Sequence, residues 1–120
     1  SFSSVFGSNT QPSEEELRDF WEIINYKDGK HLFHNLITYM KDRQLHRERW
    51  LKALTQSPIP IALINGSVDP VSGAHLVSRY KQLGCRLDAL TELPDIGHYP
   101  QVEAPKQVLE AYGNFFESIQ

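Results

Sequence analysis

The chain has 120 residues, of which 40% are hydrophobic and 22% are charged, and its formal net charge at pH 7 is -3. This composition is typical of a folded globular domain and excludes a disordered chain. The slightly acidic balance gives no electrostatic reason to expect nucleic acid or an anionic membrane as a partner. The longest apolar run, 59–64, is too short to cross a bilayer.

The cysteine content and the amino end bear on the cellular compartment. A single cysteine, Cys85, leaves no possibility of an internal disulfide, which fits a reducing compartment. Residues 1–6 contain no basic segment and no cleavage site, so we expect no secretory signal peptide. Both observations favour a cytoplasmic location and leave open a membrane association of a longer parent protein.

The first half of the chain predicts helices. Ser13 precedes three glutamates, and Glu16 completes a capping box, so a helix is expected over about 13–26. A second helix is expected over about 31–44, and a shorter third one around Trp50. The aromatic side chains expected to form the core of this region are Phe20, Trp21, Phe33 and Trp50.

The second half of the chain changes to a strand–helix–strand–helix pattern. The apolar run 61–64 shows no alternation and predicts a strand buried on both faces, as in parallel sheets. A helix over 72–83, a weaker strand over 86–90, a loop over 91–104 and an amphipathic helix from Pro105 follow. Two strands leave unpaired backbone at both sheet edges. We therefore expect a carboxyl-terminal part of a longer protein, or a chain that pairs with another.

Two residues that follow the predicted strands can carry chemistry. Asp69 comes after the first strand and His98 after the second, and ligands of open α/β sheets bind beyond these strand ends. An aspartate that orients a histidine base forms two thirds of a nucleophilic triad. The alternatives are a turn-capping role for Asp69 and an ordinary loop position for His98. Asp95 is a second candidate for orienting the ring.

The nucleophile of such a triad is not visible in these residues. No Gly-x-Ser-x-Gly elbow occurs, and Ser67 and Ser72 lie outside the strand–turn–helix context that such an elbow needs. Cys85 comes before the second predicted strand, at the opposite end of the sheet, and is interpreted as a packing residue. The chain alone is therefore expected to hold an incomplete triad.

No metal or organic cofactor is expected. His31, His34 and His46 lie near one another in the sequence but lack the further ligands that a metal site needs. We interpret them as solvated helix residues. The basic stretch 41–52 contains interspersed acidic residues and no aromatic stacking platform, so it is also interpreted as a solvated face rather than a nucleic-acid surface.

Two motifs of the second half resemble a known family. Gly66-x-x-Asp69-Pro70, followed by Gly97-His98-Tyr99-Pro100 with Glu103 and Pro105 behind it, resembles the carboxyl-terminal part of α/β-hydrolases. The similarity is to the branch of haloalkane dehalogenases and epoxide hydrolases. Upstream motifs are similar to the hydrolases grouped with mesoderm-specific transcript protein: Phe6-Gly7, Pro12-Ser13-Glu14, Asp28-Gly29 and Arg47-x-Arg49-Trp50-x-x-Ala53-Leu54.

The resemblance implies an α/β fold in which 1–56 form a helical cap segment. Residues 57–120 would be the last strand–helix–strand–helix of the core. It implies Asp69 as triad acid, His98 as triad base and Tyr99 as a substrate-binding residue. The nucleophile, usually an aspartate in this branch, would lie in an amino-terminal half supplied by the same parent or by a partner chain. The expected activity is hydrolysis of a small apolar or amphipathic substrate. A serine esterase or lipase, or a non-catalytic binding protein, remain alternatives.

Overall fold

The computed structural model describes residues 2–120, and the chain divides into two compact units. One unit is Pro12–Ala53. The other joins the residues up to Gln11 with Leu54–Gln120. The segment 2–11, which the sequence analysis groups with the cap, therefore belongs to the same unit as the sheet.

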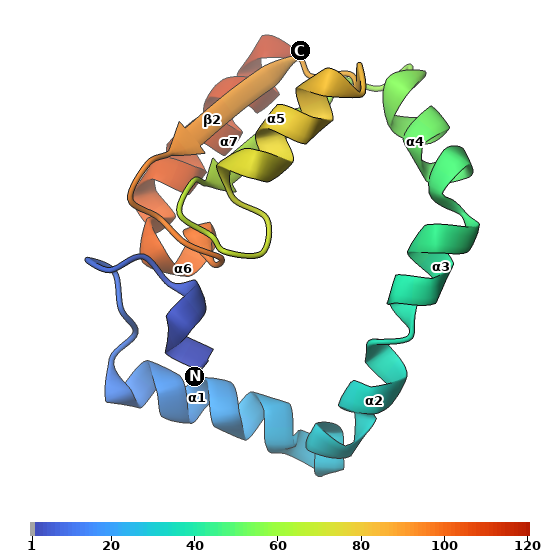
Figure 1. The fold of residues 1–120 in the computed structure, drawn as a ribbon. Helices are drawn as coiled ribbons and strands as arrows, with labels where there is room; N and C mark the ends of the chain where they lie inside the picture. The colour runs from blue at the N-terminus through green and yellow to red at the C-terminus, as the bar shows by residue number, and fades with distance from the viewer. Residues whose placement is uncertain (1) are drawn as a thin grey trace. The chain divides into compact units, whose positions relative to one another are not determined.

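The unit Pro12–Ala53 is built from helices. Helix α1 (Glu14–Asn25) begins at the predicted capping box: the amide of Glu16 donates to Ser13 Oγ, and the Ser13 amide donates to the Glu16 carboxylate. This confirms the predicted first helix. The elements that follow are η2 (Tyr26–Leu32), α2 (Phe33–Leu36), α3 (Tyr39–Leu45) and α4 (Arg47–Thr55). Figure 1 labels the α-helices among them.

The single helix predicted over 31–44 is wrong. The chain turns between α2 and α3, where Thr38 Oγ1 donates a 2.6 Å hydrogen bond to the carbonyl of Asn35. A threonine hydroxyl that bonds to nearby backbone competes with the regular helical ladder, and β-branched residues fit a helix poorly. The apolar stripe that suggested one helix therefore runs across two short ones.

The expected aromatic core of the helical unit is also wrong for the described chain. Trp21 is 55% exposed and Phe33 is 52% exposed, and none of the residues 12–53 is buried. The main contacts of these helices join successive elements, α1 with η2 and η2 with α2. An amphipathic helix buries its apolar stripe only against a second layer, and neighbours in sequence do not supply one here.

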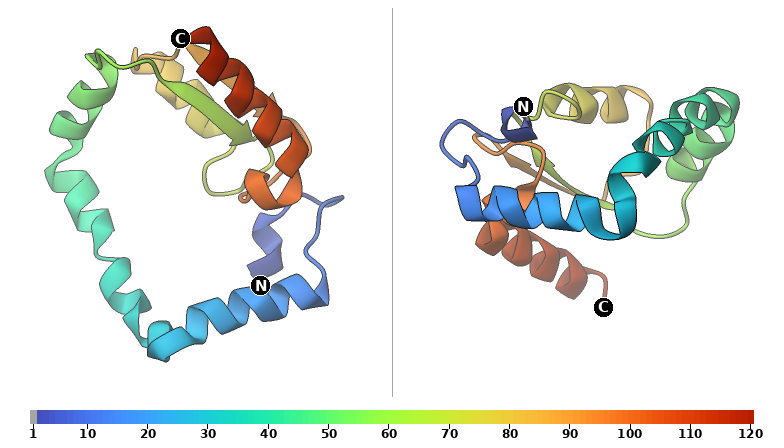
Figure 2. Two further views of the ribbon diagram at one scale, coloured as in Figure 1. Left: turned by 180° about the vertical axis from the view of Figure 1, so that it is seen from behind. Right: turned by 90° about the horizontal axis from the view of Figure 1, so that it is seen from below.

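The other unit contains a small parallel sheet between helices. Strands β1 (Ala62–Gly66) and β2 (Ala89–Leu93) pair in parallel along their whole lengths. Helix α5 (Ala74–Gln82) connects them and lies on one face, and α7 (Pro105–Ser118) lies on the other (Figure 2). The short elements α6 (Pro100–Glu103) and η1 (Phe2–Val5) complete the unit. The arrangement is compatible with an α/β fold.

The bounds predicted for the second strand, 86–90, are wrong, because β2 begins only at Ala89. Arg86 and Asp88 precede the strand and form a side-chain ion pair. The Arg86 guanidinium donates two hydrogen bonds to Asp88, at 2.7 and 2.9 Å, and one to the Ser57 carbonyl. The Asp88 carboxylate also accepts the amide of Ile61. These bonds, led by the one from Arg86, lower the pKa of Asp88 to about 2. The polar residues Thr91 and Glu92, assigned to a loop, lie in the strand instead.

The core of this unit lies toward the carboxyl end of the sheet. It consists of Leu93, Ile96 and Ala104, with Ile64 and Val108 packed against them. The first three residues of β1 are only half-buried, so the strand is less covered than its uninterrupted apolar run predicts. The best-packed part of the chain is therefore the end from which Asp69 and His98 emerge.

Candidate active site

Asp69 lies in the turn after β1 and is 5% exposed. The amide of Val71 donates a 2.8 Å bond to its Oδ1, which is the local pattern of an aspartate that closes a turn. The Asn65 side chain supports the turn from the strand, because its Nδ2 donates to the Ser72 carbonyl at 2.7 Å. Asp69 therefore closes this turn as considered, and its Oδ2, which also accepts the Ser72 hydroxyl, remains in reach of a more distant partner.

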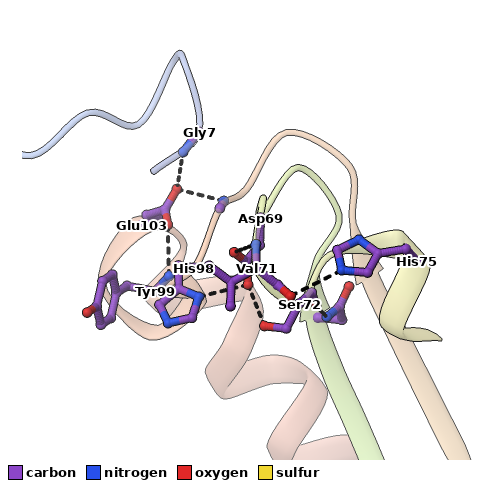
Figure 3. A network of polar contacts seen from close by, with 10 residues as sticks. Gly7, Asp69, Val71, Ser72, His75, His98, Tyr99 and Glu103 are labelled. Carbon is purple, nitrogen blue, oxygen red and sulfur yellow. Dashed lines mark hydrogen bonds and ion pairs between the residues drawn. The ribbon is translucent and has the colours of Figure 1, made fainter. Parts of the chain in front are cut away.

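The second oxygen of that carboxylate meets His98. Nδ1 of His98 lies 2.8 Å from Asp69 Oδ2, although the two residues are 29 positions apart in the sequence. Figure 3 shows the imidazole and the carboxylate pointing toward one another from the ends of their two strands. The imidazole is one-third exposed, whereas the carboxylate is buried. The structure thus brings together the two residues that the sequence analysis selected.

Electrostatics determine which nitrogen carries the proton. Burial alone would raise the pKa of the Asp69 carboxyl, but hydrogen bonds from Ser72, Val71 and His98 outweigh burial and hold the pKa below its usual value. An ionised carboxylate only accepts hydrogen bonds, so Nδ1 of His98 is the protonated nitrogen. In the neutral ring, Nε2 then has a free lone pair, which is the atom a general base uses.

The other candidates for a triad role are placed elsewhere. Ser72 Oγ donates a 2.5 Å bond to Asp69 Oδ2, so its hydroxyl faces the acid and not the base. Asp95 is exposed, and His98 Nδ1 is hydrogen-bonded to Asp69 instead. The alternative in which Asp95 orients the imidazole is therefore wrong. Cys85 precedes β2 at the far end of the sheet, and burial raises the pKa of its thiol.

Tyr99 lies beside the imidazole. Its ring stands edge to face with that of His98, with centroids 4.9 Å apart, and it also contacts the rings of Phe2 and Phe6. A partly exposed aromatic surface next to a candidate base is a common lining for an apolar substrate. The contribution of Phe2 and Phe6 was not predicted, since no local pattern links residues 2–6 to residue 99. The substrate-binding role of Tyr99 stays a prediction.

Sequence reasoning also missed the role of Glu103. Its carboxylate accepts four hydrogen bonds, from the amides of Gly7, Gly97 and Tyr99 and from Thr10 Oγ1. Burial acts to raise the pKa of Glu103, and these bonds outweigh it, so the pKa lies below its usual value. The only signal in the sequence was the glutamate five residues after the histidine, and that spacing does not reveal partners 96 and 93 positions away.

The described residues 2–120 contain no group of three or more histidine, cysteine or acidic side chains placed to hold a metal ion. His31 makes only a long, exposed contact of 3.8 Å with Asp28. Across the same residues, no helix has both the length and the apolar character that a membrane span requires.

Curated proteins match most of the chain. It is 37% identical over 110 residues to "Putative hydrolase LipZ" of Mycobacterium tuberculosis, and 36% identical over 116 residues to mesoderm-specific transcript protein of Mus musculus. The corresponding homolog protein of Homo sapiens is 38% identical over 116 residues. These matches cover 92% to 96% of this chain but only 38% to 35% of the relatives, so the chain spans little more than a third of their length.

The matches indicate the class of protein to which the chain is related. They support a relationship to α/β-hydrolases, the class that the motifs around Asp69 and His98 resemble. The printed name of the first relative describes that protein as a putative hydrolase. Neither a protein-family model nor a solved structure matches the chain.

Proposed function

We propose that these residues are the carboxyl-terminal part of an α/β-hydrolase of the haloalkane dehalogenase and epoxide hydrolase branch. Its substrate would be a small apolar or amphipathic molecule, with Asp69 as the acid and His98 as the base of the triad. The observation that carries this proposal is the 2.8 Å contact between His98 Nδ1 and Asp69 Oδ2 at the carboxyl ends of two paired parallel strands. It leaves Nε2 available to accept a proton.

The chemistry would proceed in two steps. A carboxylate nucleophile attacks a carbon atom of the substrate and forms an ester with it, while the carbon–halogen bond breaks and releases halide, or the epoxide carbon–oxygen bond breaks and the opened ring oxygen takes a proton from water. His98 Nε2 then takes a proton from water as the water oxygen attacks the ester carbonyl, and the imidazolium returns a proton to the departing alkoxide. The buried, ionised Asp69 stabilises the imidazolium that exists between these events. No metal or organic cofactor takes part.

The nucleophile and the remaining strands would come from an amino-terminal half, in the same parent or in a partner chain. Two observations support this partner. Among the described residues, β1 and β2 pair only with each other, which leaves an unpaired edge on each strand. Many large apolar side chains of the helical unit are exposed, including Trp21, Ile23, Tyr26, Leu36 and Leu45.

Within that whole protein, the helical unit 12–53 would serve as the cap that shapes the substrate site and excludes water. Tyr99, which contacts the His98 ring, would line the substrate site. The residues 2–120 taken alone would show no turnover, because the nucleophile belongs to the other half.

The test uses the whole protein with a panel of haloalkanes, epoxides and p-nitrophenyl esters. We expect Asp69→Asn to lower kcat by about 10⁴-fold, as loss of the orienting acid does in other triads. His98→Gln should abolish turnover. The exposed Asp95→Asn serves as matched control and should keep wild-type activity. Equal activity of wild type, Asp69→Asn and His98→Gln would overturn the assignment. Turnover confined to p-nitrophenyl esters would indicate a serine esterase instead.

A further inference from the structure

We propose that Glu103 is a positioning residue for His98, and that it acts by locking residues 5–10 onto the loop that carries the histidine. We call residues 5–10 the strap. The inference rests on the proposed role of His98 and adds a residue to it, because Glu103 lies outside the acid–base pair and bonds to the backbone on both sides of the histidine.

The backbone around His98 is held at three consecutive amides. The Gly97 amide donates to Glu103 Oε2 at 2.8 Å, and the Tyr99 amide donates to Glu103 Oε1 at 3.0 Å. The amide of His98 itself donates to the carbonyl of Val5 at 2.8 Å. Glu103 therefore fixes both neighbours of the histidine, while the strap fixes the histidine.

The same carboxylate also holds the strap. Glu103 Oε2 accepts the amide of Gly7 at 2.8 Å and the hydroxyl of Thr10 at 2.6 Å. Figure 3 shows the Glu103 side chain between Gly7 and the loop of His98 and Tyr99. Because Oε2 also accepts the Gly97 amide, one oxygen joins two segments that lie far apart in the sequence. Charged acceptors make stronger hydrogen bonds than neutral ones.

Three glycines allow the backbones to approach one another here. A Cβ on Gly97 would collide with the carbonyl of Val5, and a Cβ on Gly7 would collide with the carbonyl of Asp95. A Cβ on Gly66, at the end of β1, would collide with the carbonyl of Gly97. Strap, histidine loop and strand end are therefore in direct backbone contact, so a shift of the strap is transmitted to His98.

This geometry distinguishes positioning from simple stabilisation. The imidazole reaches Asp69 from a loop, and side chains on loops keep a productive geometry only where hydrogen bonds from neighbouring residues hold the loop in place. Both amides beside His98 donate to that one carboxylate. Loss of the carboxylate should therefore loosen the Nδ1–Oδ2 contact, beyond any loss of stability.

The experiment compares Glu103→Gln with Glu110→Gln, an exposed glutamate on α7, in the whole protein. An amide at position 103 keeps the shape but loses the charge and one acceptor oxygen. We expect kcat to fall by about 10²-fold with KM little changed, which is the cost of a misplaced catalytic group. We also expect the NMR signal of the His98 Nδ1 proton to broaden or shift, whereas Glu110→Gln leaves kcat and signal unchanged. A Glu103→Gln protein that is less stable but keeps wild-type kcat and an unchanged signal would overturn the proposal.

A milder variant covers the case in which Glu103→Gln does not fold. Thr10→Val removes one donor from the strap and keeps the side-chain shape. We expect a smaller loss of kcat and a smaller shift of the same signal, and unchanged values for both would contradict the strap. Failure of the proposed function looks different: His98→Gln would then retain activity, while the His98 Nδ1 proton signal of the wild-type protein and its response to Glu103→Gln would still report the contact.

Discussion

The two units of this chain form helices equally well but differ in what lies against them. In the helical unit 12–53, α1 has a complete capping box, yet no residue is buried. In the unit with the sheet, Leu93, Ile96 and Ala104 close a small core between β2 and the helices that follow. Local signals are therefore sufficient to start a helix, whereas burial needs a second layer. The candidate catalytic pair is found where that layer exists.

The largest effect is expected in the core of the sheet unit. Leu93→Ala removes a side chain that is 4% exposed and should lower the free energy of unfolding of the whole protein by about 2–5 kcal/mol. Leu109→Ala, at an exposed site on α7, is the matched control and should change it by less than about 0.5 kcal/mol. Urea unfolding measures both. Equal losses would contradict the core assigned here.

Acid should destabilise the sheet unit next most strongly. The pKa values of Asp69 and Glu103 lie below their ordinary values of 3.8 and 4.5, because hydrogen bonds to each carboxylate outweigh burial. The unfolded chain then binds more protons than the folded one, so stability is complete above about pH 4.5 and is lost as the pH falls through the lower folded values. Unfolding curves between pH 7 and pH 3 test this, and Glu103→Gln should flatten the dependence. A stability that rises in acid would contradict the assignment.

A smaller effect concerns the turn that holds Asp69. Ser72→Ala removes the second donor to Asp69 Oδ2 and should cost about 1–1.5 kcal/mol. It should also raise the pKa of the Asp69 carboxyl toward its ordinary value, since the Ser72 bond is one of those that lower it. Carbon-13 NMR of the Asp69 carboxyl follows its titration. An unchanged titration would show that the Ser72 bond does not form in solution. Ser78→Ala, on the exposed face of α5, is the control.

The smallest effect is expected in the helical unit. Ser13→Ala removes the N-cap of α1 and should reduce the stability of that helix by about 1 kcal/mol, without affecting the sheet unit. Amide hydrogen exchange resolves the two units, so faster exchange should be confined to the first turns of α1. Faster exchange in β1 or β2 as well would show that the two units unfold together, and would contradict their separate stabilities.

The sequence was sufficient where the controlling contacts are local or repeat along one element. The capping box at Ser13 predicted α1, and the apolar spacing after Pro105 predicted α7. The approach of Asp69 to His98 could also be predicted, because the ends of paired parallel strands meet at one edge. What could not be predicted depends on partners far away in the chain.

Strand β2 begins only after the Arg86–Asp88 pair, which is bonded to Ser57 and Ile61. No pattern within 86–90 indicates those partners. Two of the four bonds to Glu103 come from a strap more than 90 positions away. The exposure of the aromatic residues in 12–53 depends on what covers them, which helical periodicity does not reveal.

The most direct test of the catalytic pair is the mass of the whole protein with His98→Gln after mixing with a reactive haloalkane or epoxide. If His98 activates the water that cleaves an ester intermediate, the first step still occurs and the second fails, so the protein should gain the mass of one bound substrate-derived group. Continued turnover at the wild-type rate with no added mass would contradict the central claim, because the imidazole held by Asp69 would then have no part in the reaction.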